Sequence, residues 1–285
     1  MPTVIAVVQQ KGGCAKTTTS ANLAAGLAGR GFRVLAIDTD PQNALAYRFG
    51  ASPDPYISLK EAIFEQRLRG AIAPTQVKNL VIVPADESFD AVEIVLLHSK
   101  NPMKVNPMTL LDTALRGVKD EYDFVVIDTP TGLNHVPFNA IAAADFCVVP
   151  SDAGPDSFRM LTTTLDAIEQ IRAVYKPHVA PKDFFRVVMT MVTHQEKTEN
   201  ELFEAKLDEH FPGSKLQTKI RRRVTHKLAG EGHMTIYDFY REAPHDQGAR
   251  EAVEDTENLI NEVLSHAQTN TEPTNTGAAE LQRQD

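Results

Sequence analysis

The stretch that decides the fold is Gln9-Gln10-Lys11-Gly12-Gly13-Cys14-Ala15-Lys16-Thr17-Thr18-Thr19. An apolar run at residues 4–8 precedes it and predicts a buried parallel strand. Residues 20–30, rich in Ala and Leu, predict a helix after it. A strand, a glycine turn, a Lys-Thr pair and a helix, in this order, form the layout of a phosphate-binding loop. Backbone N–H groups and the positive end of the helix can hold phosphates there.

Within this stretch, each residue type suits one task. Lys16 supplies a positive charge to the phosphates, and the Thr17 hydroxyl is a Mg²⁺ ligand. Ala15 occupies a position at which a glycine is usual. Glycine tolerates backbone angles there that cost alanine free energy. The alternative interpretation is a glycine turn before a helix that starts with threonines. The residues expected to bind nucleotide here are Lys11, Gly12, Gly13, Cys14, Ala15, Lys16, Thr17 and Thr18.

The composition limits the class of protein. A chain of 285 residues with 42% hydrophobic residues can bury a sizeable core, and no apolar run approaches the roughly 20 residues of a membrane span. Met1-Pro2 leads into the first strand without a signal-type segment, and the two cysteines, Cys14 and Cys147, favour a reducing compartment. We therefore expect a cytoplasmic protein. The net charge of −9 excludes a globally basic surface but not a local basic patch.

A second motif follows the apolar run at residues 32–37, which predicts another strand. It reads Asp38-Thr39-Asp40-Pro41-Gln42-Asn43. Ligand groups of open α/β sheets gather at the carboxyl ends of strands. We expect Asp40 to orient or deprotonate the attacking water and Asp38 to lie in the outer shell of the magnesium. The alternative is a plain strand-end turn closed by Asp and Pro.

A third motif occupies residues 122–130 and reads Tyr-Asp-Phe-Val-Val-Ile-Asp-Thr-Pro. Its apolar core predicts a strand that ends at Asp128, as in a Walker B carboxylate that holds Mg²⁺ through water. Residues 129–139 would be the switch that senses the γ-phosphate. An Asp at a strand end is common, so Asp128 alone is weak evidence. The prediction of a Walker B carboxylate depends on the order of the three motifs along the chain.

The rest of the chain predicts a scaffold for these motifs. We expect strands at residues 79–85, 144–150 and 184–191. We expect helices at residues 58–68, 87–97, 157–175, 199–210 and 251–265, and a further helix that ends at about residue 119. Together they predict one α/β domain, residues 1–265, with a twisted, mainly parallel sheet and helices on both faces. Residues 266–285 predict a disordered polar tail. No Asn-Lys-x-Asp guanine-reading motif occurs, which favours ATP over GTP.

A basic cluster lies at residues 215–227, which hold six cations and no Asp or Glu. In an acidic chain, such a cluster suits phosphate contacts that position DNA without reading bases. The alternative is a solvated basic face. The cations are Lys215, Lys219, Arg221, Arg222, Arg223 and Lys227.

The motifs resemble the deviant Walker A of ParA/MinD ATPases, K-G-G-x-G-K-[ST]-[ST], in which Lys11 matches the signature lysine. Residues 38–43 resemble the family's D-x-D-P-Q-G-N without its glycine. Residues 122–130 resemble Y-D-x-x-x-I-D-x-P-P, with Thr131 in place of the second proline. Thr190-Met191 matches T-M-[FY]-D, and residues 220–223 match I-P-R-N, with Arg221 and Arg223 in place of Pro and Asn.

The resemblance implies a deviant Walker A P-loop NTPase that uses ATP and Mg²⁺. Its ATP-dependent homodimer would bind nonspecific double-stranded DNA on the nucleoid, and a ParB-like or adaptor partner would stimulate hydrolysis during plasmid or chromosome segregation. The catalytic residues would be Lys11, Asp40 and Lys16. Of these, Lys11 would act on the partner subunit's ATP. Thr190 and Met191 would lie at the nucleotide. Arg222 and Lys227 would contact DNA, and Arg221 and Arg223 either DNA or the base.

Two other functions fit the same resemblance. One is a ParA-like positioner of protein cargo, of the carboxysome or chemoreceptor type, that uses the same DNA tether. The other is a MinD-like regulatory ATPase without DNA binding. A membrane-targeting helix should carry Lys and Arg on its polar face, but the helix predicted at residues 251–265 carries mostly acids there, so we expect no membrane partner.

Overall fold

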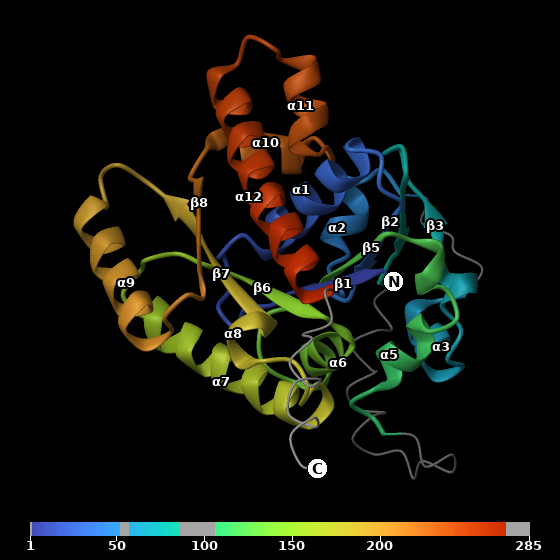
Figure 1. Ribbon diagram of the computed structural model, residues 1–285. Helices are drawn as coiled ribbons and strands as arrows, with labels where there is room; N and C mark the ends of the chain where they lie inside the picture. Colours follow the sequence, from blue (N-terminus) through green and yellow to red (C-terminus); the bar gives the residue numbers. More distant parts are fainter. Residues whose placement is uncertain (1, 52–56, 86–105, 272–285) are drawn as a thin grey trace, which may run out of the picture.

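The computed structural model describes residues 2–51, 57–85 and 106–271, in which a central sheet lies between two layers of helices (Figure 1). The strand order is β3-β4-β2-β5-β1-β6-β7-β8. Only the short β3 runs antiparallel to its neighbour. The strands are β1 (Thr3–Val7), β2 (Val34–Asp38), β3 (Ala73–Pro74), β4 (Leu80–Val83), β5 (Phe124–Asp128), β6 (Phe146–Ser151), β7 (Phe185–Val192) and β8 (Lys215–Arg221). The predicted fold class is confirmed.

The two faces of the sheet bear different helices. One face packs against α1 (Lys16–Gly29), α2 (Ala44–Arg48) and α12 (Gln247–Thr271). Two further helices, α10 (Val224–Glu231) and α11 (Ile236–Glu242), contact α12 on this side. The other face packs against α3 (Leu59–Phe64), α5 (Leu110–Leu115), α6 (His135–Ala143), α7 (Ser157–Tyr175), α8 (Pro181–Phe184) and α9 (Lys197–His210). Short 3₁₀ turns span η1 (Leu68–Ala71) and η3 (Lys119–Glu121).

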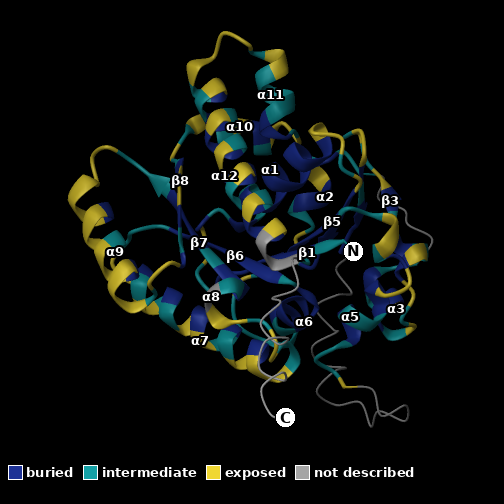
Figure 2. Cartoon of the chain, in the orientation of Figure 1, coloured by how far each residue is buried: buried dark blue, intermediate teal, exposed yellow. Residues whose placement is uncertain are grey.

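The first strand shows why its sequence is apolar throughout. Val4 and Ala6 belong to the core on one face of the sheet, and Ile5 and Val7 belong to the core on the other. Successive side chains of a strand point to opposite faces, and both faces of a parallel sheet are covered by helices. The strands are therefore buried through the middle of the molecule, while exposed residues lie on the outer sides of the helices (Figure 2).

Several element boundaries differ from the sequence prediction. Helix α1 begins at Lys16 rather than at residue 20, and α12 continues past residue 265 to Thr271, with His266 and Ala267 buried. Strand β8 was expected only as a basic cluster, and its burial alternates along the strand. The helix predicted at 87–97 lies outside the described residues, as does the part of the predicted tail from 272 onward.

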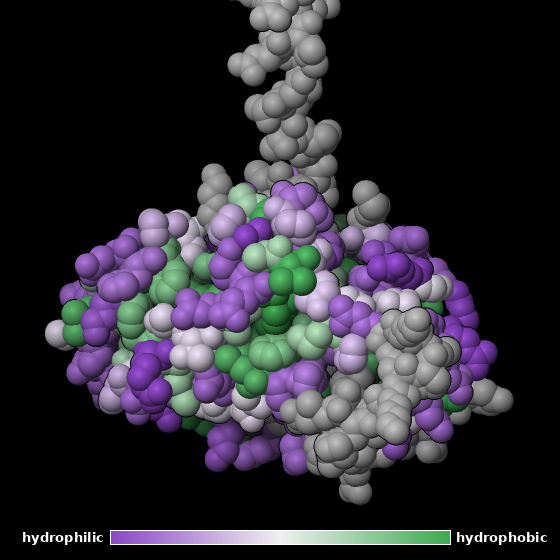
Figure 3. Space-filling view, turned by 90° about the horizontal axis from the view of Figure 1, so that it is seen from below, coloured by the Kyte–Doolittle hydropathy of each residue, from purple (hydrophilic) through white to green (hydrophobic). Residues whose placement is uncertain are grey.

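The described helices include none that is both long enough and apolar enough to cross a membrane. Seen from below, the face opposite α1 and α12 shows apolar surface near its middle within a hydrophilic surround (Figure 3). Partly buried side chains such as Phe138 and Tyr175 pack against the core on that side of the sheet.

Candidate nucleotide-binding site

The three predicted motifs meet at one edge of the sheet, the carboxyl ends of its central strands. Strands β2, β5 and β1 are neighbours, and Asp38 at the end of β2 pairs in register with Asp128 at the end of β5. Val7, the last residue of β1, also pairs in register with Asp128. The loop that leaves β1 therefore starts beside the two carboxylates, as expected for strands that end at the same edge.

The loop turns sharply into α1. Gly13 and Ala15 both have positive φ angles, of 76° and 67°, and Ala15 occupies the N-cap position with ψ 31°. No side chain caps the helix, and its first turn holds no acidic residue. The first N–H groups of a helix have no partner inside it. This turn therefore presents free donors and the positive end of the helix dipole to an anion.

Lys16 lies inside the loop. Its side chain is buried, and its ammonium donates to the carbonyl of Lys11 at 3.2 Å without forming an ion pair among the described residues. The neighbouring Cys14 carbonyl accepts a hydrogen bond from the Thr190 hydroxyl at 2.9 Å, so β7 braces the loop. A buried cation without a carboxylate partner needs an anionic ligand to offset its desolvation.

Both carboxylates at the strand ends are buried. Asp38 accepts backbone N–H groups from Asp40 at 3.1 Å and from Leu45 at 2.9 Å. Burial and the nearby charge of Asp128 raise the pKa of Asp38 well above its usual value. Burial likewise raises the pKa of Asp128 to about 6, although hydrogen bonding from the Ser20 hydroxyl, at 2.7 Å, lowers it.

A magnesium ion fits beside Asp128. Its Oδ2 is buried and lacks a hydrogen-bond partner among the described residues. The Thr17 hydroxyl is close enough to lower the pKa of this carboxylate. The described residues include no group of three or more His, Cys, Asp or Glu that could hold a metal alone. Thr17, Asp128 and phosphate oxygens would hold the ion together, with Asp38 behind them.

Asp40 and the segment after β5 flank this centre. One Asp40 oxygen accepts the N–H of Gln42 at 3.0 Å, which leaves the second oxygen for another donor. Gly132, in the predicted switch, donates its N–H to the Gln10 carbonyl at 3.2 Å. The Thr131 methyl group lies 3.6 Å from the position that a Cβ on Gly12 would take. The predicted switch therefore touches the phosphate loop directly.

Lys11 points elsewhere. Its ammonium lies 2.7 Å from both carboxylate oxygens of Asp152 and 2.7 Å from the Ser157 hydroxyl. These partners follow β6 and begin α7, and they lie more than a hundred residues away along the chain. Sequence reasoning missed both, because nothing local to Lys11 signals them. The ammonium groups of Lys11 and Lys16 therefore lie in different places, the first at Asp152 and the second inside the phosphate loop.

The basic cluster is largely neutralised by acids. Arg221 pairs with Asp255 of α12 at 2.6 Å, and Arg223 pairs with Glu251. Lys215 lies 2.9 Å from Asp208, and Lys219 pairs with Glu204 of α9. Sequence reasoning could not foresee these pairs, because α9 and α12 supply the acids.

Two residues of the cluster remain available. Arg222 is exposed and forms no ion pair within the described part of the chain. Lys227 is exposed and lies 3.5 Å from Glu231, one turn along the same helix. Such an exposed pair holds its cation weakly. Met191, which has a φ of 58°, lines a cavity together with Arg222 and Asp152.

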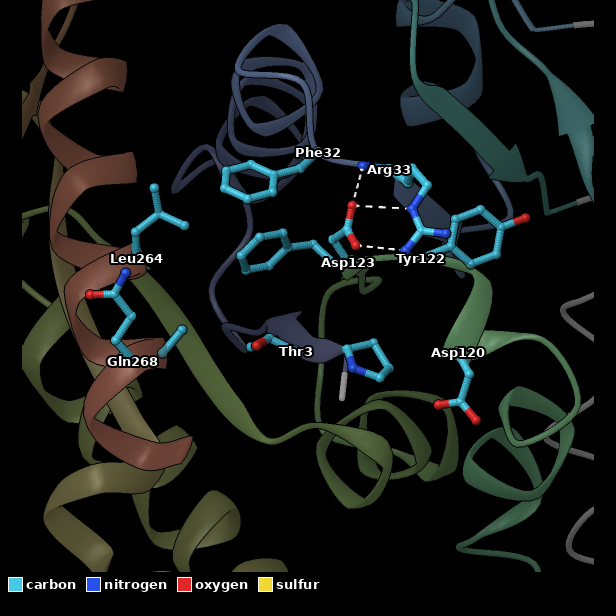
Figure 4. A pocket seen from close by; sticks show the side chains of 11 residues that line it. Thr3, Phe32, Arg33, Asp120, Tyr122, Asp123, Leu264 and Gln268 are labelled. Carbon is cyan, nitrogen blue, oxygen red and sulfur yellow. Dashed lines mark hydrogen bonds and ion pairs between the residues drawn. The ribbon is translucent and has the colours of Figure 1, made fainter. Parts of the chain in front are cut away.

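A cavity of about 580 Å³ at the other edge of the sheet lacks these features (Figure 4). It lies where β1, β2 and β5 begin and is lined by Phe32, Phe124 and the Arg33–Asp123 ion pair. Arg33 and Asp123 satisfy each other there, and no glycine loop lines the cavity. The features expected of a nucleotide site therefore lie at the carboxyl edge of the sheet.

Comparisons with known proteins identify the family to which the chain is similar. Residues 2–180 match a family model described as an AAA domain. A ParA family protein of Chlamydia pneumoniae is 33% identical over 223 residues, which are 78% of this chain and 84% of that protein. The chromosome partitioning protein ParA of Myxococcus xanthus is 34% identical over 59% of each chain. The structure of a Cyanothece McdA(D38A)–ATP complex has a similar fold, with a TM-score of 0.76 at 19% identity over 93% of this chain and 96% of that one.

Proposed function

Because the chain belongs to the ParA family of ATPases, we propose that it is a magnesium-dependent ATPase that dimerises around ATP and binds DNA nonspecifically. A ParB-like partner would stimulate it during segregation of plasmid or chromosomal DNA. One observation supports the catalytic part: among the described residues, the buried Oδ2 of Asp128 has no hydrogen-bond partner, and Lys16 at the same edge forms no ion pair. The relative from Myxococcus xanthus, a chromosome partitioning protein, supports the DNA part.

The residues divide the reaction among them. Lys16 and the free N–H groups at the start of α1 would bind the phosphates, and Thr17 and Asp128 would hold a magnesium ion, which would supply positive charge to the phosphate oxygens. Asp40 accepts a proton from the attacking water while the bond between the γ-phosphorus and its bridging oxygen breaks. The expected product pair is ADP and phosphate.

Lys11 supports dimerisation in this proposal. In the single chain, Asp152 and Ser157 hold its ammonium away from the Lys16 pocket. In the dimer, Lys11 would leave them for the partner subunit's ATP. An Asp40→Ala background that traps ATP should give a dimer by light scattering, and adding Lys11→Ala should leave a monomer. A dimer in the double variant would refute the role.

The experiment that tests the proposed function measures DNA binding by fluorescence anisotropy, with ATP, ADP or no nucleotide. Arg222 and Lys227 give two contacts per subunit and about four per dimer, so log K against log salt should have a slope near −4. Arg222→Ala should weaken binding to every sequence alike, and Arg116→Ala, a change of an exposed arginine that follows α5, should not. Binding that ignores ATP would contradict the proposal.

The neutralised cluster favours one alternative, a MinD-like regulatory ATPase without DNA binding. Four of the six cations face acids of α9 or α12. If ATP is bound and hydrolysed but no duplex binds at any salt concentration, this alternative replaces DNA segregation. A ParA-like positioner of protein cargo would also bind DNA in this experiment. It would differ only in moving a protein assembly instead of DNA.

A further inference from the structure

An arginine outside the recognised motifs lies beside the phosphate loop. Arg48 ends α2, the helix that follows Asp40, and its guanidinium lies 3.4 Å from the Thr18 hydroxyl. Thr18 is the third residue of α1. A Cβ on Gly230 of α10 would lie only 2.6 Å from Arg48 Nη2, so the glycine leaves room for the guanidinium. Three separate elements therefore fix this side chain.

No ion pair among the described residues explains the place of Arg48. It forms no ion pair with any acid of the described residues, and burial lowers its pKa, although the charge of Asp128 acts in the opposite direction. A guanidinium that is taken out of water without a carboxylate costs free energy. This cost is expected of a residue whose anionic partner is a ligand.

Two side-chain nitrogens at the start of α10 also lack hydrogen-bond partners, although Arg223 Nη2 pairs with Glu251. Arg223 Nε and His226 Nε2 are buried atoms without hydrogen-bond partners in the described structure. Burial and the charges of Arg48 and Arg223 lower the pKa of His226 to about 4, although Asp255 raises it. His226 is therefore neutral at pH 7, and Arg223 is paired with Glu251, so Arg48 is the cation here without an ion pair among the described residues. Unused donors of this kind suit an oxygen-rich anion.

The position of Thr18 selects the part of the nucleotide. Lys16 and Thr17 serve the terminal phosphates and the magnesium, so the next free N–H along the turn is that of Thr18. We propose that Arg48 binds the phosphate nearest the ribose, beside Thr18, and so completes the nucleotide site from the segment that follows Asp40. This inference rests on the proposed ATPase function and adds a phosphate ligand that the motifs do not contain.

Affinity and stability together test the inference. ATP, ADP and AMP binding would be measured by calorimetry for wild type, Arg48→Met and Arg48→Lys. Loss of an arginine–phosphate contact should weaken all three nucleotides about tenfold to a hundredfold, and the ratio of ATP to ADP affinity should not change. Arg48→Lys keeps the positive charge but loses the bidentate geometry of the guanidinium. Its nucleotide affinity should therefore lie between those of wild type and Arg48→Met. It also provides a folded variant if Arg48→Met does not fold.

Thermal unfolding separates a ligand contact from a structural one. Without nucleotide, Arg48→Met should unfold at the wild-type temperature or higher, because it removes an unpaired cation, and it should lose most of the shift that ATP produces. Arg172→Met is the matched control, since Arg172 is 8% exposed and pairs with Glu169 at 2.6 Å. That control should unfold at lower temperature and bind ATP normally.

The outcomes distinguish the two proposals. If Lys16→Ala binds ATP as wild type does, the ATPase site itself is wrong. If Lys16→Ala loses binding while Arg48→Met and Arg48→Lys keep wild-type affinity, only the Arg48 inference fails. A loss confined to ATP would move Arg48 to the terminal phosphate and would also overturn the assignment.

Discussion

Strands β2 and β5 are neighbours that carry charged residues at both ends, and the two ends differ. Where they begin, Arg33 and Asp123 form an exposed ion pair at 2.7 Å. Where they end, Asp38 and Asp128 lie side by side, are fully buried and have the same sign. Opposite charges in water stabilise a surface only slightly, whereas two buried carboxylates cost free energy that a bound cation can repay.

The difference identifies which edge the protein uses. At the amino edge each charged group satisfies the other, and Asp123 also accepts the Arg33 N–H at 2.8 Å. At the carboxyl edge, within the described part of the chain, Lys16 forms no ion pair, Asp128 Oδ2 accepts no hydrogen bond and Ala15 has a left-handed conformation. Local inconsistency of this kind concentrates at functional sites.

The largest effect is expected from Lys16→Ala. The change removes the only ammonium inside the loop, so affinity for ATP should fall more than a hundredfold. Calorimetric titration with ATP measures it. Lys78→Ala, a change of an exposed lysine just before β4, should bind normally. Affinity within a few-fold of wild type for the Lys16 variant would return the carboxyl edge to a structural role.

Asp40→Ala should act on turnover rather than on binding. A positioned base contributes about a hundredfold or more to the rate, so phosphate release should slow by that factor while the dissociation constant for ATP stays close to wild type. Single-turnover release of phosphate is the measurement. An unchanged rate would transfer the task to Asp38 or to water held by the switch.

Asp128→Asn and Asp123→Asn test the two ends of a single strand. Burial raises the pKa of folded Asp128 to about 6, so the folded chain keeps a proton that the unfolded chain has lost. Stability therefore falls as pH rises from about 4 to 6. In the absence of nucleotide, Asp128→Asn should raise the free energy of unfolding at pH 8 by about 1–3 kcal/mol, and the gain should vanish below pH 4.

The matched variant should show the opposite sign. Hydrogen bonds from Arg33 lower the pKa of Asp123, so its contribution is present above the unfolded pKa and is lost as pH falls through the folded pKa. Asp123→Asn should therefore be slightly less stable than wild type at pH 8 and equal to it in acid. Urea unfolding at about pH 2.5, 6 and 8 measures both. Parallel pH profiles would show that the two ends do not differ.

The sequence predicted the carboxyl edge well because its motifs are contiguous. Each motif joins a buried strand to the residue at its end, as Asp38 and Asp128 show, and parallel strands bring such ends together. The start of α1 was misplaced because Lys16 and the threonines after it are weaker helix formers than the alanines that follow. The tertiary site, through Ser20 and Asp128, overrides that preference.

The partners across the fold were beyond local reasoning. Asp152 holds Lys11 from 141 residues away, and Asp255 neutralises Arg221 from 34 residues away. Arg48 belongs to no motif, and only the packing of α2, α1 and α10 brings it to the loop. Strand β8 alternates buried Leu216 and Ile220 with exposed residues, a signal that the concentration of basic residues obscured.

The smallest expected effect concerns the backbone at the two edges. Asn79, just before β4, has a φ of 65°, and Ala15 has a φ of 67°. Asparagine tolerates the left-handed conformation, whereas alanine loses about 1–2 kcal/mol in it. Glycine avoids that cost but adds about 0.4–1 kcal/mol of unfolded-state entropy. Ala15→Gly should therefore raise the free energy of unfolding by about 0.5–1 kcal/mol, and Asn79→Gly should change it by less.

Urea unfolding of nucleotide-free protein distinguishes the two variants, because their midpoints should separate while the slopes stay equal. ATP affinity measured in parallel shows whether the strain at Ala15 shapes the loop for phosphate. If Ala15→Gly is more stable but binds ATP more weakly, the alanine restricts the loop to a binding-competent conformation. If Ala15→Gly is less stable than wild type, the left-handed alanine is not strained, and the two edges differ in their charges alone.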